Sequence, residues 1–249
     1  MNEKQNIINF YEHECDEANR LTSTRMNSVE FLTTMKYLKA LCPTQAEILD
    51  ACAGTGVYAF PLAEMGHNVT AGDLVKYNVE KIRKKQETNP LLKKIYTGSI
   101  MDLSMFEDNS FDVVLNFGAF YHLRNEEDRV KSITESLRIL KPNGIYCLAY
   151  LNRYANYIKY SDQMKNNFNI FEEYINKGYN EASYAFYASS PEEVEALMAS
   201  FNLKQLHNVA TDGIKFIMND TVNSLNEDVF QRWLNMHFSL AERLYNTTE

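Results

Sequence analysis

Two glycines and two carboxylates stand at a spacing that suits the binding of a nucleoside. Gly54 and Gly56 follow an apolar segment that ends at Asp50, and Asp73 comes 17 residues after Gly56, at the end of the next apolar segment. Glycines let a turn tighten and let a ligand approach the backbone. A carboxylate in the position of Asp73 can accept hydrogen bonds from both hydroxyls of a ribose. The spacing therefore predicts a ligand that contains a nucleoside.

The residue before the glycine turn separates two kinds of nucleoside cofactor. A dinucleotide site has the pattern G-x-G-x-x-G and places a pyrophosphate at a helix N-terminus. Here Asp50 precedes the turn, and Ala59 stands where the third glycine would be. A carboxylate at this point would repel phosphates, whereas it suits the amino group and sulfonium of an amino-acid nucleoside. A nicotinamide cofactor remains the alternative.

The elements that position these residues alternate between strand and helix. Strands are expected at residues 47–51, 67–73, 94–98, 111–117 and 145–150, and helices at 57–65, 75–87 and 125–140. This alternation predicts a doubly wound, Rossmann-like α/β fold, in which helices cover both faces of a mostly parallel sheet. Such sheets bind ligands at the carboxyl ends of their strands. The glycine turn and Asp73 would both lie at that edge.

The rest of the chain is expected to extend this core within a single domain of residues 1–249. Residues 1–44 are interpreted as an N-terminal helical arm, with helix over 3–41 interrupted near Leu21–Thr24; 45–150 as the cofactor-binding core; 151–190 as an inserted, lid-like segment that holds seven tyrosines and three phenylalanines; and 191–249 as the C-terminal part of the fold. In that last part we expect helices at 191–201 and 227–245 and strands at 204–209 and 213–218. The sheet would then have seven strands, although the chain could also stop short of the seventh.

Several segments, in order, resemble the motifs of class I S-adenosylmethionine-dependent methyltransferases. Residues 48–56 resemble the first motif, an acidic residue before a G-x-G-x-G run, with Cys52 in place of the first glycine. Asp73-Leu74 is similar to the second motif, and residues 98–103 are similar to the third. Residues 108–123 resemble the stretch that ends beside the methionine part of the cofactor. The resemblance covers about residues 45 to 150, and the arm looks like that of small bacterial members of unassigned substrate.

The resemblance implies a set of residues that bind S-adenosylmethionine. In the core these are Asp50, Ala51, Cys52, Gly54, Thr55, Gly56, Asp73, Leu74, Ile100, Met101, Asp102, Asn116, Phe117 and Gly118. In the arm, Tyr11 and Arg25 could reach the carboxylate of the cofactor when the arm folds over the site. The alternative is that Arg25 is an ordinary surface cation and Tyr11 a packed aromatic residue.

Methyl transfer from a sulfonium is an in-line displacement, for which the enzyme mainly aligns the acceptor with the methyl group. It requires neither a metal ion nor a covalent nucleophile. A hydroxyl or ammonium acceptor must lose a proton, and His122 is the leading candidate base, followed by Tyr121. Either residue could instead only shape the pocket. We also hypothesise that Tyr154, Tyr157, Tyr184 and Tyr187 line a pocket for an amine or aromatic acceptor, although aromatic residues more often form a packing layer.

Composition restricts the possible partners. The net charge of −8 opposes binding to a phosphate backbone, so nucleic acid is not expected as a substrate. No apolar run approaches the roughly 20 residues of a membrane-spanning helix, and the first residues lack the profile of a secretory signal. We expect a cytoplasmic monomer or homodimer that methylates an oxygen or nitrogen of a small molecule, without a membrane partner. A non-catalytic protein that kept the cofactor pocket is the alternative.

Overall fold

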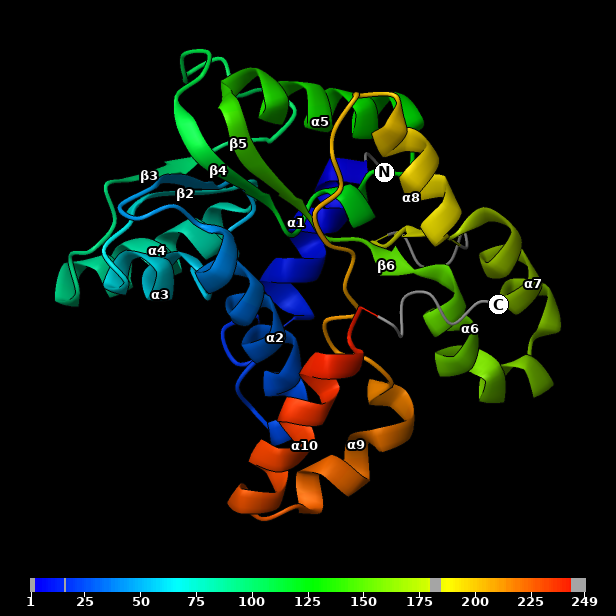
Figure 1. Ribbon diagram of the computed structural model, residues 1–249. Helices are drawn as coiled ribbons and strands as arrows, with labels where there is room; N and C mark the ends of the chain where they lie inside the picture. The colour runs from blue at the N-terminus through cyan, green and yellow to red at the C-terminus, as the bar shows by residue number, and fades with distance from the viewer. Residues whose placement is uncertain (1–2, 16, 180–184, 243–249) are drawn as a thin grey trace.

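The computed structural model describes residues 3–15, 17–179 and 185–242 (Figure 1). Its main sheet contains β1 (Glu47–Asp50), β2 (Asn68–Asp73), β3 (Lys94–Thr97), β4 (Phe111–Asn116) and β5 (Leu140–Leu148). All neighbours in this sheet pair in parallel, in the order β3-β2-β1-β4-β5. The direction of winding reverses between β1 and β4, which is where a doubly wound sheet opens its ligand crevice.

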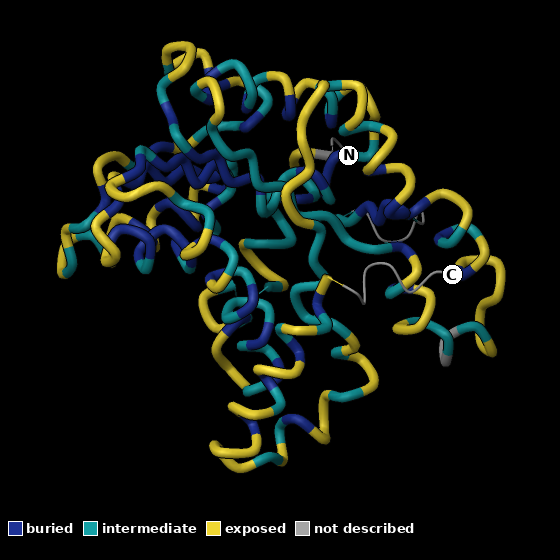
Figure 2. The backbone as a smooth tube through the Cα atoms, in the orientation of Figure 1, coloured by how far each residue is buried: buried dark blue, intermediate teal, exposed yellow. Residues whose placement is uncertain are grey.

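Helices cover both faces of the sheet, as expected (Figure 1). They are α3 (Ala59–Glu64), α4 (Lys76–Thr88) and α5 (Glu126–Ile139). Ile48 of β1 packs in one apolar cluster with Leu62 and Ile82, from α3 and α4. The next residue, Leu49, belongs to a second cluster with Ile139 at the end of α5. Because successive side chains of a strand point to opposite faces, β1 is buried on both sides. Figure 2 shows the strands at the centre of the sheet as a continuously buried part of the backbone.

The expectation of seven strands is wrong, because the main sheet has five strands among the described residues. Residues 204–209 form no strand, and the segment expected as strand seven lies largely in α9 (Lys215–Ser224). Met218, Val222 and Leu225 pack in one cluster with residues of α2 (Arg25–Leu41) and α10 (Glu227–Leu240). Their spacing is helical, and the apolar run 214–218 was too short to distinguish strand from helix by periodicity.

The fifth strand also begins earlier than expected. β5 starts at Leu140, directly after α5, so residues 140–144 belong to the strand instead of forming a turn before it. Phe111 pairs with Leu140 and Val113 pairs with Ile145, so the register shifts between these pairs through a bulge. Such a bulge accommodates extra residues in one strand of a pair. Most of β5 is only partly buried, because the strand is at the edge of the sheet.

The arm and the inserted segment contain the remaining elements. In the arm, α1 (Glu3–His13) is separated from α2 by a break that is longer than expected, and Thr24 caps α2 by accepting a hydrogen bond from the Asn27 N–H. After β4 comes a short helix, η1 (Phe120–His122). The inserted segment holds β6 (Leu151–Asn152), α6 (Arg153–Tyr160), η2 (Ser161–Lys165), α7 (Phe168–Lys177) and β7 (Ala188–Ser189), and α8 (Pro191–Ala199) follows. β6 and β7 pair in parallel as a separate two-stranded sheet.

Candidate active site

A cavity of about 360 Å³ lies at the carboxyl ends of β1, β2 and β4. Of the residues expected in the site, those that line it are Tyr11, Ala51, Cys52, Gly54, Asp73, Leu74, Ile100, Met101, Asp102, Phe117, Gly118, Tyr121 and His122. Asp50, Thr55, Gly56, Asn116 and Arg25 are not among the lining residues. The cavity therefore brings together most of the separate sequence motifs at the point where the winding of the sheet reverses.

The glycine turn has the backbone that its sequence predicts. Gly54 and Gly56 have φ values of +52° and +84°, a region that favours glycine. Cys52, in the place of the expected first glycine, is accommodated by Gly118: a Cβ on Gly118 would lie 2.8 Å from the Cβ of Cys52. The Cys52 thiol also donates to Oδ1 of the buried Asn116 at 3.9 Å. Asn116 thus supports the turn from behind the cavity wall.

Asp73 lies at the end of β2, where three hydrogen bonds hold its carboxylate. One of its carboxylate oxygens accepts from the Gly54 N–H at 2.8 Å, and the other accepts from the Val75 N–H at 2.8 Å and from Nδ2 of Asn78 at 3.3 Å. Burial raises the pKa of Asp73 to about 6, and these donors oppose the rise. The side chain ties the glycine turn to the start of α4 and also faces the cavity. Each oxygen has further lone pairs for a ligand.

Asp50 lies at the end of β1 and is 1% exposed. Neither of its carboxylate oxygens has a hydrogen-bond partner among the described residues. Burial, together with the charge of Asp73, raises the pKa of Asp50 to about 7; the nearby Cys52 N–H opposes the rise without forming a full hydrogen bond. An unsatisfied, buried carboxylate is costly unless a positive charge or a donor approaches it. This turn therefore fits a ligand with a cationic end better than a pyrophosphate.

His122 is buried beside the cavity and is held by two partners. Its Nε2 lies 2.9 Å from the Tyr11 hydroxyl, and its Nδ1 is bonded to the carbonyl oxygen of Ala185. A carbonyl can only accept, so Nδ1 carries the proton and Nε2 accepts from Tyr11. Burial lowers the pKa of His122 to about 4. The imidazole is therefore neutral near pH 7, and its basic nitrogen faces Tyr11.

Tyr121 also lines the cavity, but its hydroxyl is engaged. The hydroxyl donates to the carbonyl oxygen of Phe117 at 2.9 Å, and burial raises the pKa of Tyr121 well above its usual range. The backbone oxygen of Tyr121 accepts from the Tyr187 N–H at 2.7 Å. Tyr121 is thus a neutral wall residue and a docking point for the inserted segment.

Of the tyrosines expected around an acceptor, the three among the described residues do not line this cavity. Tyr154 and Tyr157 are 41% and 47% exposed, and Tyr187 lies buried under the guanidinium of Arg129 at 4.3 Å. Tyr184 lies outside the described residues. Instead, Phe186 reaches the site region: its ring centroid is 4.9 Å from that of His122 and 5.1 Å from that of Phe10 in α1.

The arm contributes residues that the sequence did not point to. Lys4, Ile7 and Glu17 line the cavity together with Tyr11. Arg25 lies elsewhere: its guanidinium donates to the carbonyl oxygen of Leu225 at 2.6 Å and pairs with Glu227. Arg25 thus lies at the start of α2, beside α10, and does not line the cavity. No motif marks Glu17, and only the fold of the arm brings it to the site.

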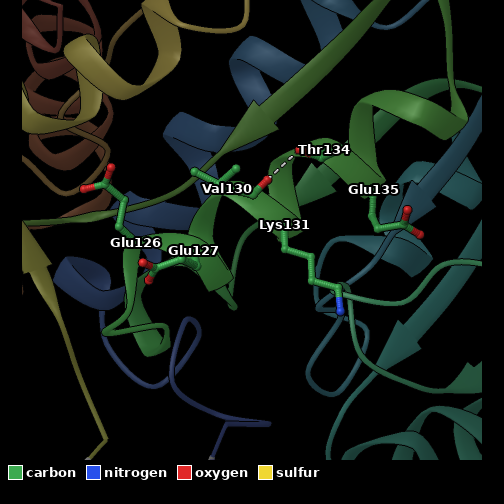
Figure 3. Close-up of a pocket in the computed structure, with 6 residues that line it drawn as sticks. All are labelled: Glu126, Glu127, Val130, Lys131, Thr134 and Glu135. Atoms are coloured by element: carbon green, nitrogen blue, oxygen red, sulfur yellow. Dashed lines mark hydrogen bonds between the residues drawn. The ribbon is translucent and has the colours of Figure 1, made fainter.

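A second hollow runs along the outer surface of α5 (Figure 3). It is lined by Glu126, Glu127, Val130, Lys131, Thr134 and Glu135. All of these residues come from one helix, and the three carboxylates point in different directions (Figure 3). Ligand sites are normally formed by groups that converge from several elements. The hollow is therefore a groove between side chains on a helix surface.

Comparisons with known proteins agree with this geometry. A family model described as a methyltransferase domain matches residues 49–148. The ubiquinone biosynthesis O-methyltransferase of Rickettsia typhi is 32% identical over 110 residues, which cover 44% of this chain and 43% of the relative. The demethylmenaquinone methyltransferase of Lactococcus lactis is 33% identical over 150 residues, which cover 58% of this chain and 57% of the relative. The chain thus spans only about half the length of these curated relatives.

Solved structures share the fold. A SAM-dependent methyltransferase from Methanosarcina mazei superposes with a TM-score of 0.55 at 21% identity, covering 66% of this chain and 82% of that chain. A protein from Pyrococcus horikoshii superposes with a TM-score of 0.54 at 21% identity, covering 80% and 89%. Residues 49–148 are thus a methyltransferase domain, the solved structures share its fold, and together these findings support a class I S-adenosylmethionine-dependent methyltransferase. S-adenosylmethionine is the cofactor of this class. None of the helices in the described ranges has the length and apolar character needed to cross a membrane.

Proposed function

We propose that this protein transfers the methyl group of S-adenosylmethionine to an oxygen or nitrogen atom of a small-molecule acceptor. The observation that carries this proposal is the cavity, which joins the glycine turn and Asp73 to the Tyr11–His122 pair. The first part suits a nucleoside with a cationic amino-acid end. The second part offers a hydroxyl and an imidazole, which are groups that can orient an acceptor and move its proton.

Each expected cofactor residue would contact one part of the cofactor. Asp73 would accept from the ribose hydroxyls, Leu74 would lie against adenine, and the backbone of Ile100 and Met101 with Asp102 would meet the adenine edge. Phe117 and Gly118 would flank the methionine part. When bound, the cofactor supplies a methyl group activated by the adjacent sulfonium. The protein then contributes alignment, because the reacting atoms must be held in line.

The Tyr11–His122 contact restricts how an acceptor can lose its proton. Nε2 of His122 is the only unprotonated nitrogen of the ring, and it accepts from the Tyr11 hydroxyl. An acceptor proton can therefore reach His122 through that hydroxyl, or directly once Tyr11 has moved away. In the first case the Tyr11 hydroxyl passes its own proton to His122 and takes up that of the acceptor. In the second case the Tyr11–His122 hydrogen bond breaks before His122 acts as the base. We retain His122 as the candidate base, with Tyr11 as its immediate neighbour.

The relatives and the cavity wall guide the choice of acceptors. The named relatives are a ubiquinone biosynthesis O-methyltransferase and a demethylmenaquinone methyltransferase. The wall near His122 consists largely of aromatic and apolar side chains, including Ile7, Phe117 and Leu123. We infer that a ring bearing hydroxyl groups, or an aromatic amine, is the first class of acceptor to test. The net charge of −8 supports a small molecule over nucleic acid, and we propose a cytoplasmic monomer or homodimer.

Methyl transfer is tested by incubating the protein with S-adenosylmethionine and a panel of catechols, naphthoquinols and aromatic amines. Formation of S-adenosylhomocysteine with an equal amount of methylated product is the expected result. Production of neither compound across the panel, while the protein still binds S-adenosylhomocysteine, would instead favour a non-catalytic protein that kept the pocket. Replacement of Asp73 by Ala provides a control that should weaken cofactor binding and reduce the reaction with it.

A further inference from the structure

Glu17 lies directly over the glycine turn. It belongs to the segment between α1 and α2, it lines the cavity, and its side chain is 13% exposed. A Cβ built on Gly54 would lie 3.2 Å from Cγ of Glu17 and 3.6 Å from its Oε1. The absence of a side chain at Gly54 therefore lets the carboxylate of the arm approach the turn. Among the described residues, Glu17 is the one that a side chain on Gly54 would meet.

Arg20 fixes the orientation of this carboxylate. Its Nε donates to both oxygens of Glu17, at 3.1 and 2.9 Å, and its Nη1 donates to Glu30 in α2 at 2.8 Å. The thiol of Cys15 donates to the same Glu17 carboxylate at 3.7 Å. A charged side chain held by several donors loses little further freedom when a ligand binds. Glu17 is thus prearranged at the cavity wall.

The charges around the turn leave this end of the cavity negative. Glu17 acts on Asp73 strongly enough to raise its pKa, and Asp50 lies at the same turn. Arg20 is shared between Glu17 and Glu30, so one guanidinium pairs with two carboxylates. Two lysines, Lys4 of α1 and Lys131 of α5, also line the cavity, and the charge of Lys131 acts on Asp102, at the side expected to meet adenine. A positively charged group entering beside Gly54 would be attracted by all of these carboxylates.

We propose that Glu17 binds the protonated α-amino group of the methionine part of S-adenosylmethionine. This inference rests on the proposed function, and it assigns to the arm a cofactor contact that lies outside the sequence motifs. The ammonium has three N–H donors, and the oxygens of Glu17 keep lone pairs beyond those used by Arg20. The carboxylate of the methionine part would be repelled at this position, which orients the amino-acid end of the cofactor.

The test compares two ligands by isothermal titration: S-adenosylhomocysteine, and its deamino analogue, which lacks only the α-amino group. The wild-type protein should prefer S-adenosylhomocysteine by about 10- to 100-fold, the range for hydrogen bonds to a charged group. In Glu17→Gln this preference should fall to within about threefold, while affinity for the deamino analogue changes little. Glu30→Gln is the matched control, because Glu30 is the other carboxylate that pairs with Arg20 and it does not line the cavity. This variant should retain the preference for S-adenosylhomocysteine.

Three results would overturn the inference. Glu17→Gln could keep the full preference for S-adenosylhomocysteine, or it could weaken both ligands equally, which would show that Glu17 only supports the arm. Failure of the wild-type protein to bind S-adenosylhomocysteine would instead overturn the proposed function, and the inference with it. Thermal unfolding of each variant without ligand establishes that it is folded before the titrations are compared.

Discussion

Asp50 and Asp73 are two buried carboxylates whose charges act on each other at the glycine turn. Burial raises the pKa of Asp50 to about 7 and that of Asp73 to about 6. In the folded state without a ligand, both therefore hold their protons to a higher pH than in the unfolded chain. A cationic ligand favours the ionised forms, so its binding should become tighter as the pH rises through this range.

The raised pKa of Asp50 predicts how stability depends on pH. A carboxyl group whose pKa is raised by folding loses stability as the pH rises from its unfolded pKa, about 4, to its folded value, about 7. Asp50→Asn has no such group, so its stability relative to the wild type should improve over this interval. Urea unfolding without ligand at about pH 5 and about pH 8 measures the change. A stability difference that does not vary with pH would contradict the prediction.

Asp112→Asn provides a control of the opposite sign. Burial raises the pKa of Asp112, but the hydrogen bonds from Lys141 and from the Glu47 N–H outweigh that effect and leave the pKa below its usual range. A depressed carboxyl pKa contributes stability that is present above the unfolded pKa and is lost as the pH falls. Asp112→Asn should therefore be less stable than the wild type at neutral pH, and the difference should shrink at low pH.

The pairing of Cys52 with Gly118 gives a second prediction at the residue scale. Gly118→Ala places a Cβ 2.8 Å from that of Cys52, which is closer than real Cβ contacts allow. The variant should lose about 1–3 kcal/mol of stability through overpacking. Cys52→Gly in the same chain removes the opposing atom, and the double variant should recover most of that loss in urea unfolding. If the stability losses of Gly118→Ala and Cys52→Gly simply add in the double variant, the contact does not explain why Cys52 replaces glycine.

At the scale of elements, the C-terminal helices stabilise the molecule by packing on α2. Val222 of α9 and Phe230 and Leu234 of α10 are buried with Met26 and Val29 of α2. The arm that helps to line the cofactor cavity is thus attached through α2 to the end of the chain. His237 strengthens this attachment, since its Nε2 lies 3.1 Å from the hydroxyl of Thr33.

Leu234→Ala tests that attachment. Leu234 is 4% exposed, and truncating a buried leucine leaves a cavity that costs about 2–5 kcal/mol. Met236→Ala, on the same helix at 52% exposure, should change stability by less than about 0.5 kcal/mol. Both values come from urea unfolding. Similar effects from the two variants would mean that α10 does not pack as described.

At the scale of the whole molecule, the sequence predicted the core much better than the extensions. The strand–helix alternation over residues 45–150 follows from short buried runs and from turns with specific glycines, and these signals are local. The C-terminal part has no such signal: its apolar residues fit strand or helix, and contacts with α2 decide between them. The positions of Arg25 and Glu17 also have no local signal in the sequence. The packing of the arm places Glu17 at the cavity and Arg25 away from it.

The central claim is that the cavity at the glycine turn binds S-adenosylmethionine. It is tested most directly by titrating the protein with S-adenosylhomocysteine and, separately, with NAD, using the wild type and Asp73→Ala. We predict saturable binding of S-adenosylhomocysteine, a loss of about 10-fold or more in Asp73→Ala, and no binding of NAD. Binding of NAD in place of S-adenosylhomocysteine, or an affinity for S-adenosylhomocysteine that Asp73→Ala leaves unchanged, would contradict it.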